Sequence, residues 1–440
     1  MSTLVDNPAL DADALEALIA RHDEPDWLAE ERRAAFRTFE KTPWPTSRDE
    51  NWRFTDLPRF AVDGLTFGEG PRDAAVSDRI HMRMTDSDAE GILVHKNGEV
   101  VERRSELREH GVIFTDLRTA VREHEELVRE HLYTVVDAKA GKYHALNAAF
   151  WQNGTFVYVP RGVEVELPLG AFVTADRGGL SAGRTLVVVE DNAKLTYLDE
   201  YTSDPFDERL FHSAASELVL GPGAKVRHLS LQNWGRNVAH MNKQRAHLAR
   251  DARLESLSVS LGADAARAEV ESKLEGPGGE SEMLGLYFGD KGQHYNQYTI
   301  QHHAADHAFS DLLFKGALRD GSTAAYSGVI IVDEGAQKTD AYQTNRNLLL
   351  DSDSEAVSIP QLEIGANDVK CSHGSTTGPV PEDQRFYLMS RGMPPEVAEH
   401  LLVTGFLYEV MSRVTLPKVA AYVERVVQAK LGVPGVKEKL

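Results

Sequence analysis

The 440-residue sequence predicts a mainly β protein with helical segments at both ends. Apolar residues recur at helical spacing in the first third and in the last sixty or so residues. Between about residues 143 and 371 this spacing gives way to short β-rich runs separated by Gly, Asp, Asn and Pro. The pattern favours one long β body rather than alternating strands and helices.

The N-terminal part predicts helices and one hairpin. Apolar residues at helical spacing predict helices over residues 11–21, 26–41 and 117–133. Pro43 lies just beyond the second segment and ends that helix. In the segment 91–101, Asn97-Gly98 is the strongest two-residue turn signal and predicts a short β-hairpin.

The central part predicts many short strands. They are expected over 155–159, 163–169, 185–190, 194–199, 217–220, 225–231, 253–261, 269–274, 283–288, 295–301, 308–314 and 324–332. A sandwich, a barrel and a solenoid all satisfy this pattern, and no clear sequence repeat separates them. Regular spacing over roughly 200 residues favours a stacked coil, because each turn buries its inner face against its neighbours.

The C-terminal part predicts a pair of amphipathic helices over 395–414 and 416–431. The apolar residues expected near one face are Val397, Leu401, Leu402, Phe406 and Val410 in the first helix, and Val419, Val423, Val426 and Val427 in the second. On general grounds such a stripe packs against its own domain more often than against a partner.

Composition excludes several classes of function. With 68 acidic against 48 basic residues, the formal charge of −20 opposes binding to nucleic acid or to anionic membranes. One cysteine cannot form an internal disulfide, and the acidic residues 1–13 lack the features of a signal peptide. No run of apolar residues is long enough to cross a bilayer. We expect a reduced, cytoplasmic protein, and the acidic surplus leaves a salt-rich host open.

The only cysteine, Cys371, lies two positions before His373. On a strand, side chains at this spacing share a face and stand about 7 Å apart, which makes half of a soft-metal site. A tetrahedral site needs further ligands, and a partner chain is their natural source. Alternatively, Cys371 is a small buried apolar residue and His373 a hydrogen-bonded one. Glu363 could add an oxygen donor, but a solvated carboxylate is the commoner role.

Other motifs argue against catalysis by this chain. His302 and His303 are adjacent and face opposite sides of a strand, so at most His303 and His307 share a face and a metal cluster is disfavoured there. The sequence has no G-x-x-x-x-G-K-[ST] phosphate loop and no common hydrolase or dehydrogenase motif. Any ATP use therefore belongs to a partner.

Several segments are distinctive, namely KTDAYQTNRNLLL at 338–350, PQLEIGANDVKCSHG at 360–374, FYL at 386–388, SRG at 390–392, WRFT at 52–55, VPRGV at 159–163 and KG at 315–316. Together they resemble segments of SufD, the scaffold subunit of the SufBCD iron-sulfur assembly machinery. The resemblance is dense over about residues 290 to 410, patchy before that, and weakest in the first fifty.

Two positions favour SufD over its paralogue SufB. SufB-like chains carry a cysteine directly after the glutamine found here at Gln343, whereas this chain has Thr344. SufB-like chains also read His-Glu-Ala-Thr where this one reads His-Gly-Ser-Thr at 373–376. By resemblance, His373 matches the SufD histidine implicated in cluster assembly at the contact with SufB, and Cys371 lies beside it.

The resemblance implies a right-handed parallel β-helix core with an N-terminal α/β region and C-terminal helices. It also aligns the region of His303 with a turn of the β body, which favours a structural or hydrogen-bonding role for His303. The expected domains are residues 1–140, mixed and helical, residues 141–378, the β-helix core, and residues 379–440, helical. The implied function is a non-catalytic scaffold that pairs with SufB and binds the SufC ATPase through its C-terminal helices.

The implied metal ligands are His373 and Cys371, which would hold iron or a nascent cluster transiently, shared with SufB and not tightly bound by this chain alone. A homodimer of the isolated chain is a further option. The alternative function is a β-helix enzyme acting on polysaccharide, although such an enzyme should carry an export signal.

Overall fold

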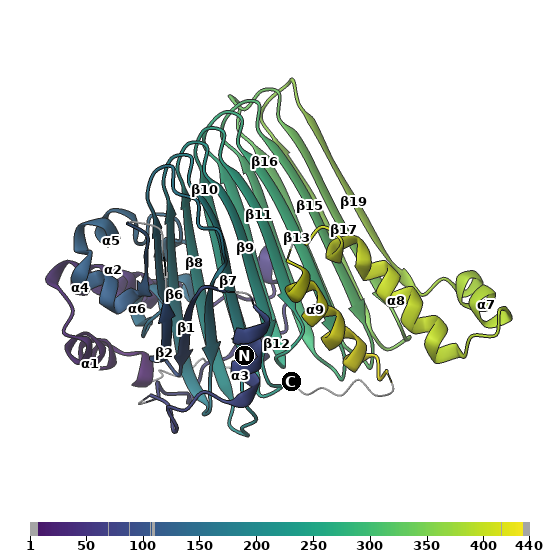
Figure 1. The fold of residues 1–440 in the computed structure, drawn as a ribbon, viewed down its shortest axis with the longest axis horizontal. Coiled ribbons are helices and arrows are strands. Elements are labelled where there is room, and N and C mark those ends of the chain that lie inside the picture. The colour runs from purple at the N-terminus through teal and green to yellow at the C-terminus, as the bar shows by residue number, and fades with distance from the viewer. Residues whose placement is uncertain are drawn as a thin grey trace.

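A computed structural model describes residues 8–68, 70–87, 89–105, 107, 111–414 and 416–433. The chain is 41% strand and 27% helix, and its body is a parallel β-solenoid of about 8 turns (Figure 1). An N-terminal α/β region precedes the solenoid and helices follow it. The predicted fold class, a mainly β protein with a parallel β-helix core, is confirmed.

Successive strands of the solenoid alternate between two sheets, so each turn adds one strand to each sheet. The ten-stranded sheet has the order β19-β17-β15-β13-β11-β9-β7-β5-β1-β2 and contains β1 Gly91–Lys96, β2 Glu99–Ser105, β5 Leu169–Thr174, β7 Lys194–Thr202, β9 Lys225–Asn233, β11 Arg253–Ser260, β13 Glu280–Gly289, β15 Phe309–Leu318, β17 Asp340–Leu349 and β19 Lys370–Pro379. All neighbours except β1 and β2 pair in parallel.

The second sheet has nine strands in the order β18-β16-β14-β12-β10-β8-β6-β4-β3. Its strands are β3 Ile113–Asp116, β4 Thr155–Val159, β6 Gly179–Val189, β8 Leu210–Leu220, β10 Val238–Leu248, β12 Ala265–Leu274, β14 His294–His303, β16 Thr323–Val332 and β18 Glu355–Ile364. Only β3 is antiparallel to its neighbour. Both sheets therefore begin with an antiparallel strand at the N-terminal end.

Most predicted strands fall within observed ones, but several observed strands, such as β3 and β17, were not predicted. Strand β10 was not predicted, because its sequence VAHMNKQRAHL is polar although most of its side chains are buried. The strand predicted over 163–169 was wrong for most of its length. The chain turns there, since Val163 N donates to Pro160 O at 3.1 Å, and β5 begins only at Leu169.

One corner of the solenoid repeats in backbone angle rather than in residue type. Seven residues with φ between 55° and 73° stack there, namely Gly162, Asn192, Gly223, Asp251, Gly278, His307 and Lys338. The backbone N–H of each donates to the carbonyl of the residue preceding the next member, or to Asp368 after the last. Five residue types occupy equivalent positions, which explains why no sequence repeat is visible.

The N-terminal region contains the predicted helices and hairpin. Its elements are η1 Pro8–Leu10, α1 Ala12–His22, α2 Asp26–Lys41, η2 Glu50–Trp52, η3 Leu57–Phe60, α3 Asp78–Asp86, α4 Leu117–Glu123, α5 Glu125–His131, η4 Ala138–Ala140 and α6 Lys142–Phe150. Asn97 and Gly98 have φ of 46° and 81°, as the tight turn between β1 and β2 requires. The helix predicted over 117–133 is broken at His124, which lets Val128 join the buried cluster of Leu117.

The C-terminal helices are α7 Glu382–Ser390, α8 Pro395–Met411 and α9 Pro417–Lys430. Together with α3, helices α8 and α9 cover a leucine-rich outer face of the ten-stranded sheet. All four valines predicted on the face of α9 are buried. Among the described residues, no helix has the length and apolarity that crossing a bilayer requires.

The predicted face of α8 was wrong in part. The residues that α8 buries are Ala398, Val403, Leu407 and Val410. Val397 and Leu401 remain 45% and 48% exposed. Apolar residues lie all around this helix, so spacing alone could not select the face that meets the sheet.

A buried contact joins the two ends of the chain across the ten-stranded sheet. Arg83 of α3 donates twice to Glu200 of β7, at 2.7 and 2.8 Å. The guanidinium lies 3.3 Å from the ring centroid of Tyr422 on α9. Helix α3 of the N-terminal region and the last helix, α9, thus meet over strand β7.

Candidate functional site

The C-terminal end of the solenoid is open. Strands β18 and β19 are the last members of their sheets, so each has a free edge. Every residue of the two strands is exposed or half-buried. This last turn carries both sequence-predicted site residues, Cys371 and His373.

Cys371 and His373 face the inside of the solenoid. On the neighbouring strand β17 their partners are Ala341 and Gln343, which are 1% and 0% exposed. Because side chains alternate along a strand, Cys371 and His373 continue these buried rows. Cys371 packs against a small apolar cluster that includes Ile330. The structure thus places thiol and imidazole on one face of β19, as their spacing predicted.

The two side chains differ in accessibility. Burial raises the pKa of the Cys371 thiol, and the nearby Asp340 carboxylate adds to this effect. The thiol therefore keeps its proton at neutral pH, and a metal must displace that proton to bind. The imidazole of His373, in contrast, is exposed at the mouth of the solenoid.

The donor set is incomplete on this chain. In the part of the chain that the structure describes, no three His, Cys, Asp or Glu side chains converge as a metal site requires. Glu363 does not join the pair. It lies opposite Ile331, between Leu362 and Ile364, which continue the buried rows of Ile330 and Val332. Alternation therefore directs Glu363 to the outer face of the other sheet.

The histidines of β14 are structural. His303 is 0% exposed, and its Nε2 lies 2.8 Å from Ser310 Oγ. Burial lowers the pKa of His303 to about 4, so the ring is neutral. The predicted hydrogen-bonding role of His303 is confirmed. His302 instead pairs with Asp333 at 3.1 Å, and His307 occupies the stacked corner.

The buried side chain of Gln343, which neighbours His373, was not identified as a site residue from the sequence. Gln343 Nε2 donates to Tyr326 Oη at 2.7 Å, and Tyr326 Oη lies 2.9 Å from Thr299 Oγ1. Gln343 stood within the segment 338–350 that carried the resemblance. Only the parallel pairing of β17 with β19 shows that it is the direct neighbour of His373.

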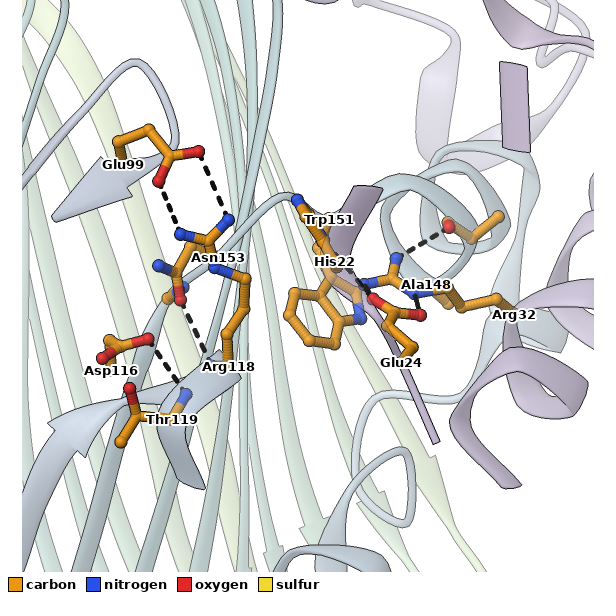
Figure 2. Close-up of polar contacts among 12 residues, drawn as sticks. His22, Glu24, Arg32, Glu99, Asp116, Arg118, Thr119, Ala148, Trp151 and Asn153 are labelled. Carbon is orange, nitrogen blue, oxygen red and sulfur yellow. Dashed lines mark hydrogen bonds and ion pairs between the residues drawn. The ribbon is translucent and has the colours of Figure 1, made fainter. Parts of the chain in front are cut away.

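The N-terminal end of the solenoid is closed by polar contacts (Figure 2). Arg32 of α2 is 0% exposed, and two of its nitrogens donate to Glu24 at 2.7 Å. Its guanidinium also lies 4.0 Å from the ring centroid of Trp151. Nearby, the side chain of Arg118 pairs with Glu99 of β2. These contacts hold the helices over the first turns.

The C-terminal helices expose a second set of apolar side chains. We call the α7–α8 patch the exposed residues Phe386, Tyr387, Met389, Val397, Leu401 and Tyr408. Helix α7 stands away from the solenoid body, and all its residues are exposed or half-buried (Figure 1). Apolar groups gathered on such a helix are typical of a protein interface.

Comparison with known proteins identifies the family. Residues 172–406 match the SufBD core domain of SUF system FeS cluster assembly, and residues 13–170 match the SufBD protein N-terminal region. An iron-sulfur cluster assembly SufBD family protein of Staphylococcus epidermidis is 29% identical over 402 residues, which cover 88% of this chain and 85% of the relative. Relatives with the same description in Staphylococcus haemolyticus and Staphylococcus saprophyticus are 29% and 28% identical over the same shares. The core match alone spans more than half of the sequence, and the chain therefore belongs to the SufBD family of iron-sulfur cluster assembly proteins.

Proposed function

We propose that this chain is a SufD-type scaffold subunit, which carries out no catalysis itself and helps to build an iron-sulfur cluster with a SufB-type paralogue. The observation that carries the proposal is the pair Cys371 and His373 on the inner face of the open last turn. Family membership supports a role in iron-sulfur assembly. A cytoplasmic location, where thiols stay reduced, is part of the proposal.

The chemistry of the pair suits a cluster in transit. Iron accepts both imidazole and thiolate ligands. Two donors leave most coordination positions of the metal open, so a partner has to complete the set. The nascent cluster is then cargo shared by two subunits, because neither subunit alone holds it firmly enough to prevent release.

The free edges of β18 and β19 support pairing with a paralogue. An edge strand offers unpaired backbone N–H and C=O groups to a strand of another chain. Apolar side chains lie exposed beside these edges, with Tyr342 at 45%, Leu362 at 37% and Ile364 at 42%. Pairing there would place Cys371 and His373 at the interface. Without the paralogue, two copies of this chain can use the same edges.

The α7–α8 patch is the proposed docking surface for a SufC-type ATPase. Its large aromatic and aliphatic side chains have the chemistry of interface anchors. The sequence lacks a phosphate-binding loop of its own, so nucleotide hydrolysis would come from this partner. The patch lies on α7, which follows the last strand, and on α8, which packs on β13 and β15 of the ten-stranded sheet.

The test is reconstitution of the complex with SufB-type and SufC-type partners. In the His373→Ala variant we expect an assembled complex whose bound iron and sulfide fall by roughly tenfold or more, because a metal donor is lost. Bound iron, acid-labile sulfide and the visible absorbance of the cluster are measured after gel filtration.

The matched control is His81→Ala, which removes an exposed histidine of α3 far from the last turn. This variant should load iron like the unmodified chain. Normal iron loading in His373→Ala would contradict the assignment of His373, and loss of the complex would show that its role is structural.

A further inference from the structure

We propose that Gln343 is a positioning residue for His373: a rotation of the His373 ring brings its N–H to the free side-chain carbonyl of Gln343, and this hydrogen bond determines which ring nitrogen faces a metal. The inference rests on the proposed function of His373 as a donor. It adds a buried residue of the preceding turn to the site.

The two side chains are direct neighbours on the inner face. Gln343 of β17 pairs with His373 of β19 in a parallel ladder. Paired residues on adjacent strands lie about 5 Å apart and project to the same side, so a rotation of the imidazole can bring it to the amide. Gln343 is 0% exposed, whereas His373 is open to solvent. Gln343 therefore lies deeper inside the solenoid than His373.

The amide of Gln343 is held in place from the opposite sheet. Its Nε2 donates to Tyr326 Oη at 2.7 Å, and Tyr326 Oη in turn lies 2.9 Å from Thr299 Oγ1. Burial raises the pKa of Tyr326, so the phenol stays protonated. This hydrogen-bonded row fixes one end of the amide.

Gly328 makes room for this arrangement. A Cβ at that position would lie 1.9 Å from Gln343 Nε2 and 2.4 Å from Tyr326 Oη. Only a residue without a side chain allows the glutamine to cross the inside of the solenoid to the tyrosine. Two neighbouring turns thus provide the three residues that orient the Gln343 amide, namely Tyr326, Thr299 and Gly328.

The other end of the amide lacks a partner. Gln343 Oε1 is buried and accepts no hydrogen bond from any residue that the structure describes. Buried acceptors are rarely left unsatisfied, because each loses its bond to water. His373 carries a ring N–H at the neighbouring position, which makes it the natural donor.

The consequence for the metal follows from imidazole chemistry. A neutral imidazole has one N–H and one lone pair, on different nitrogens. When the N–H donates to Gln343 beneath, the lone pair of the other nitrogen is directed toward the mouth of the solenoid. Histidine ligands of metals are commonly oriented in this way by a carbonyl or carboxylate.

The test reads the tautomer of His373 in the full chain, without metal or partners. Two-bond proton–nitrogen NMR spectra of the histidine-labelled protein are recorded at about pH 8, where an ordinary histidine is neutral. The resonances of His373 are identified by their loss in His373→Ala. We expect one tautomer to dominate in the unmodified chain.

Gln343→Met keeps the size of the side chain but removes the acceptor. We expect the tautomer ratio of His373 to shift at least fivefold toward an even mixture. Gln343→Glu retains an acceptor and should restore a single tautomer. Gln297→Met removes another buried glutamine of the solenoid interior, which donates to Ser260, and should leave His373 unchanged.

An unchanged tautomer ratio in Gln343→Met would overturn the proposal. If that variant does not fold, Tyr326→Phe replaces it, since loss of the phenol frees the amide and should also shift the ratio. The readout does not depend on cluster assembly. A shifted ratio together with normal iron loading in His373→Ala would therefore support the positioning while rejecting the proposed function.

Discussion

The two ends of the solenoid are finished in different ways. At the N-terminal end, antiparallel strands and helices cover the first turns, and Arg32 and Trp151 are completely buried. At the C-terminal end, β18 and β19 have free edges, and Cys371 and His373 lie at the mouth. The closed end thus buries polar groups in ion pairs and hydrogen bonds, whereas the polar groups of the last turn stay exposed or half-buried.

The largest expected effect comes from removing one partner of a buried ion pair at the closed end. Arg184 and Glu217 form an ion pair in which both side chains are 0% exposed, and Glu217 also accepts from three backbone N–H groups, those of Tyr133, Val135 and Val136. Glu217→Ala should lower the free energy of unfolding by about 3–5 kcal/mol, because the arginine is left buried without its carboxylate. Urea denaturation followed by circular dichroism measures this change.

The matched substitution at the open end is Glu363→Ala. Its carboxylate is exposed on β18, so the free energy of unfolding should change by no more than about 0.5 kcal/mol. Equal losses in Glu217→Ala and Glu363→Ala would show that the two ends do not differ as described.

A buried lysine beneath the N-terminal helices provides a pH test. Lys243 is 1% exposed, and its Nζ has no hydrogen-bond partner among the described residues. Burial lowers the pKa of Lys243 to about 8, against the attraction of Glu269 and with the repulsion of Arg267, Arg184 and Arg245. Lys243→Met should raise the free energy of unfolding at pH 7 by about 2 kcal/mol, because it removes a buried charge.

The sign of the pH dependence follows from the lowered pKa. Between about pH 8 and pH 10.5 the unfolded chain binds more protons at Lys243 than the folded chain, so this residue makes stability rise with pH. The stabilisation by Lys243→Met should therefore shrink across that range. An advantage that stays constant from pH 7 to pH 10 would contradict the assigned pKa.

The α7–α8 patch sharpens the comparison by separating binding from stability. Phe386→Ser combined with Tyr387→Ser should weaken binding of a SufC-type ATPase by roughly tenfold or more, because interface aromatics act as anchors. Unfolding should shift by less than about 0.5 kcal/mol, since both side chains are exposed. Calorimetry and urea denaturation measure the two effects.

The control is Met82→Ser, which removes a half-exposed apolar side chain of α3 outside the patch. It should leave binding unchanged. Point substitutions are preferable to deletion of the C-terminal helices, because α8 and α9 cover the leucine-rich face of the sheet. Retained binding in the double variant would remove the patch as a docking surface.

The smallest expected effect concerns the thiol at the open end. Because burial raises the pKa of Cys371, its alkylation by iodoacetamide at pH 7.5 should be about fivefold or more slower than that of free cysteine. Pairing with a SufB-type paralogue should slow it further. Mass spectrometry follows the reaction, and a rate equal to that of free cysteine would contradict the raised pKa of the thiol.

Part of the structure could be predicted from local sequence. The hairpin at Asn97-Gly98 and the buried valines of α9 follow from short-range rules. The spacing of Cys371 and His373 was enough to place both side chains on one face of a strand. In each case neighbouring residues along the chain determine the outcome.

The rest depends on which strands become neighbours. Gln343 precedes His373 by thirty positions, and only the parallel register brings them together. The same holds for Glu363, which the register assigns to the outer face of the other sheet. Strand β10 was missed because its sequence is polar. Its side chains are buried by tertiary contacts, which cannot be read from the composition of the strand itself.

The stacked corner from Gly162 to Lys338 makes the length of this protein adjustable. The backbone N–H of each corner residue bonds to the next turn, so successive turns repeat the same contact and are of similar size. Duplicating one turn in the middle would move the closed end and the open end apart by about 5 Å, the spacing of hydrogen-bonded strands. The distance between the closed end and the open end can thus be changed in steps of one turn.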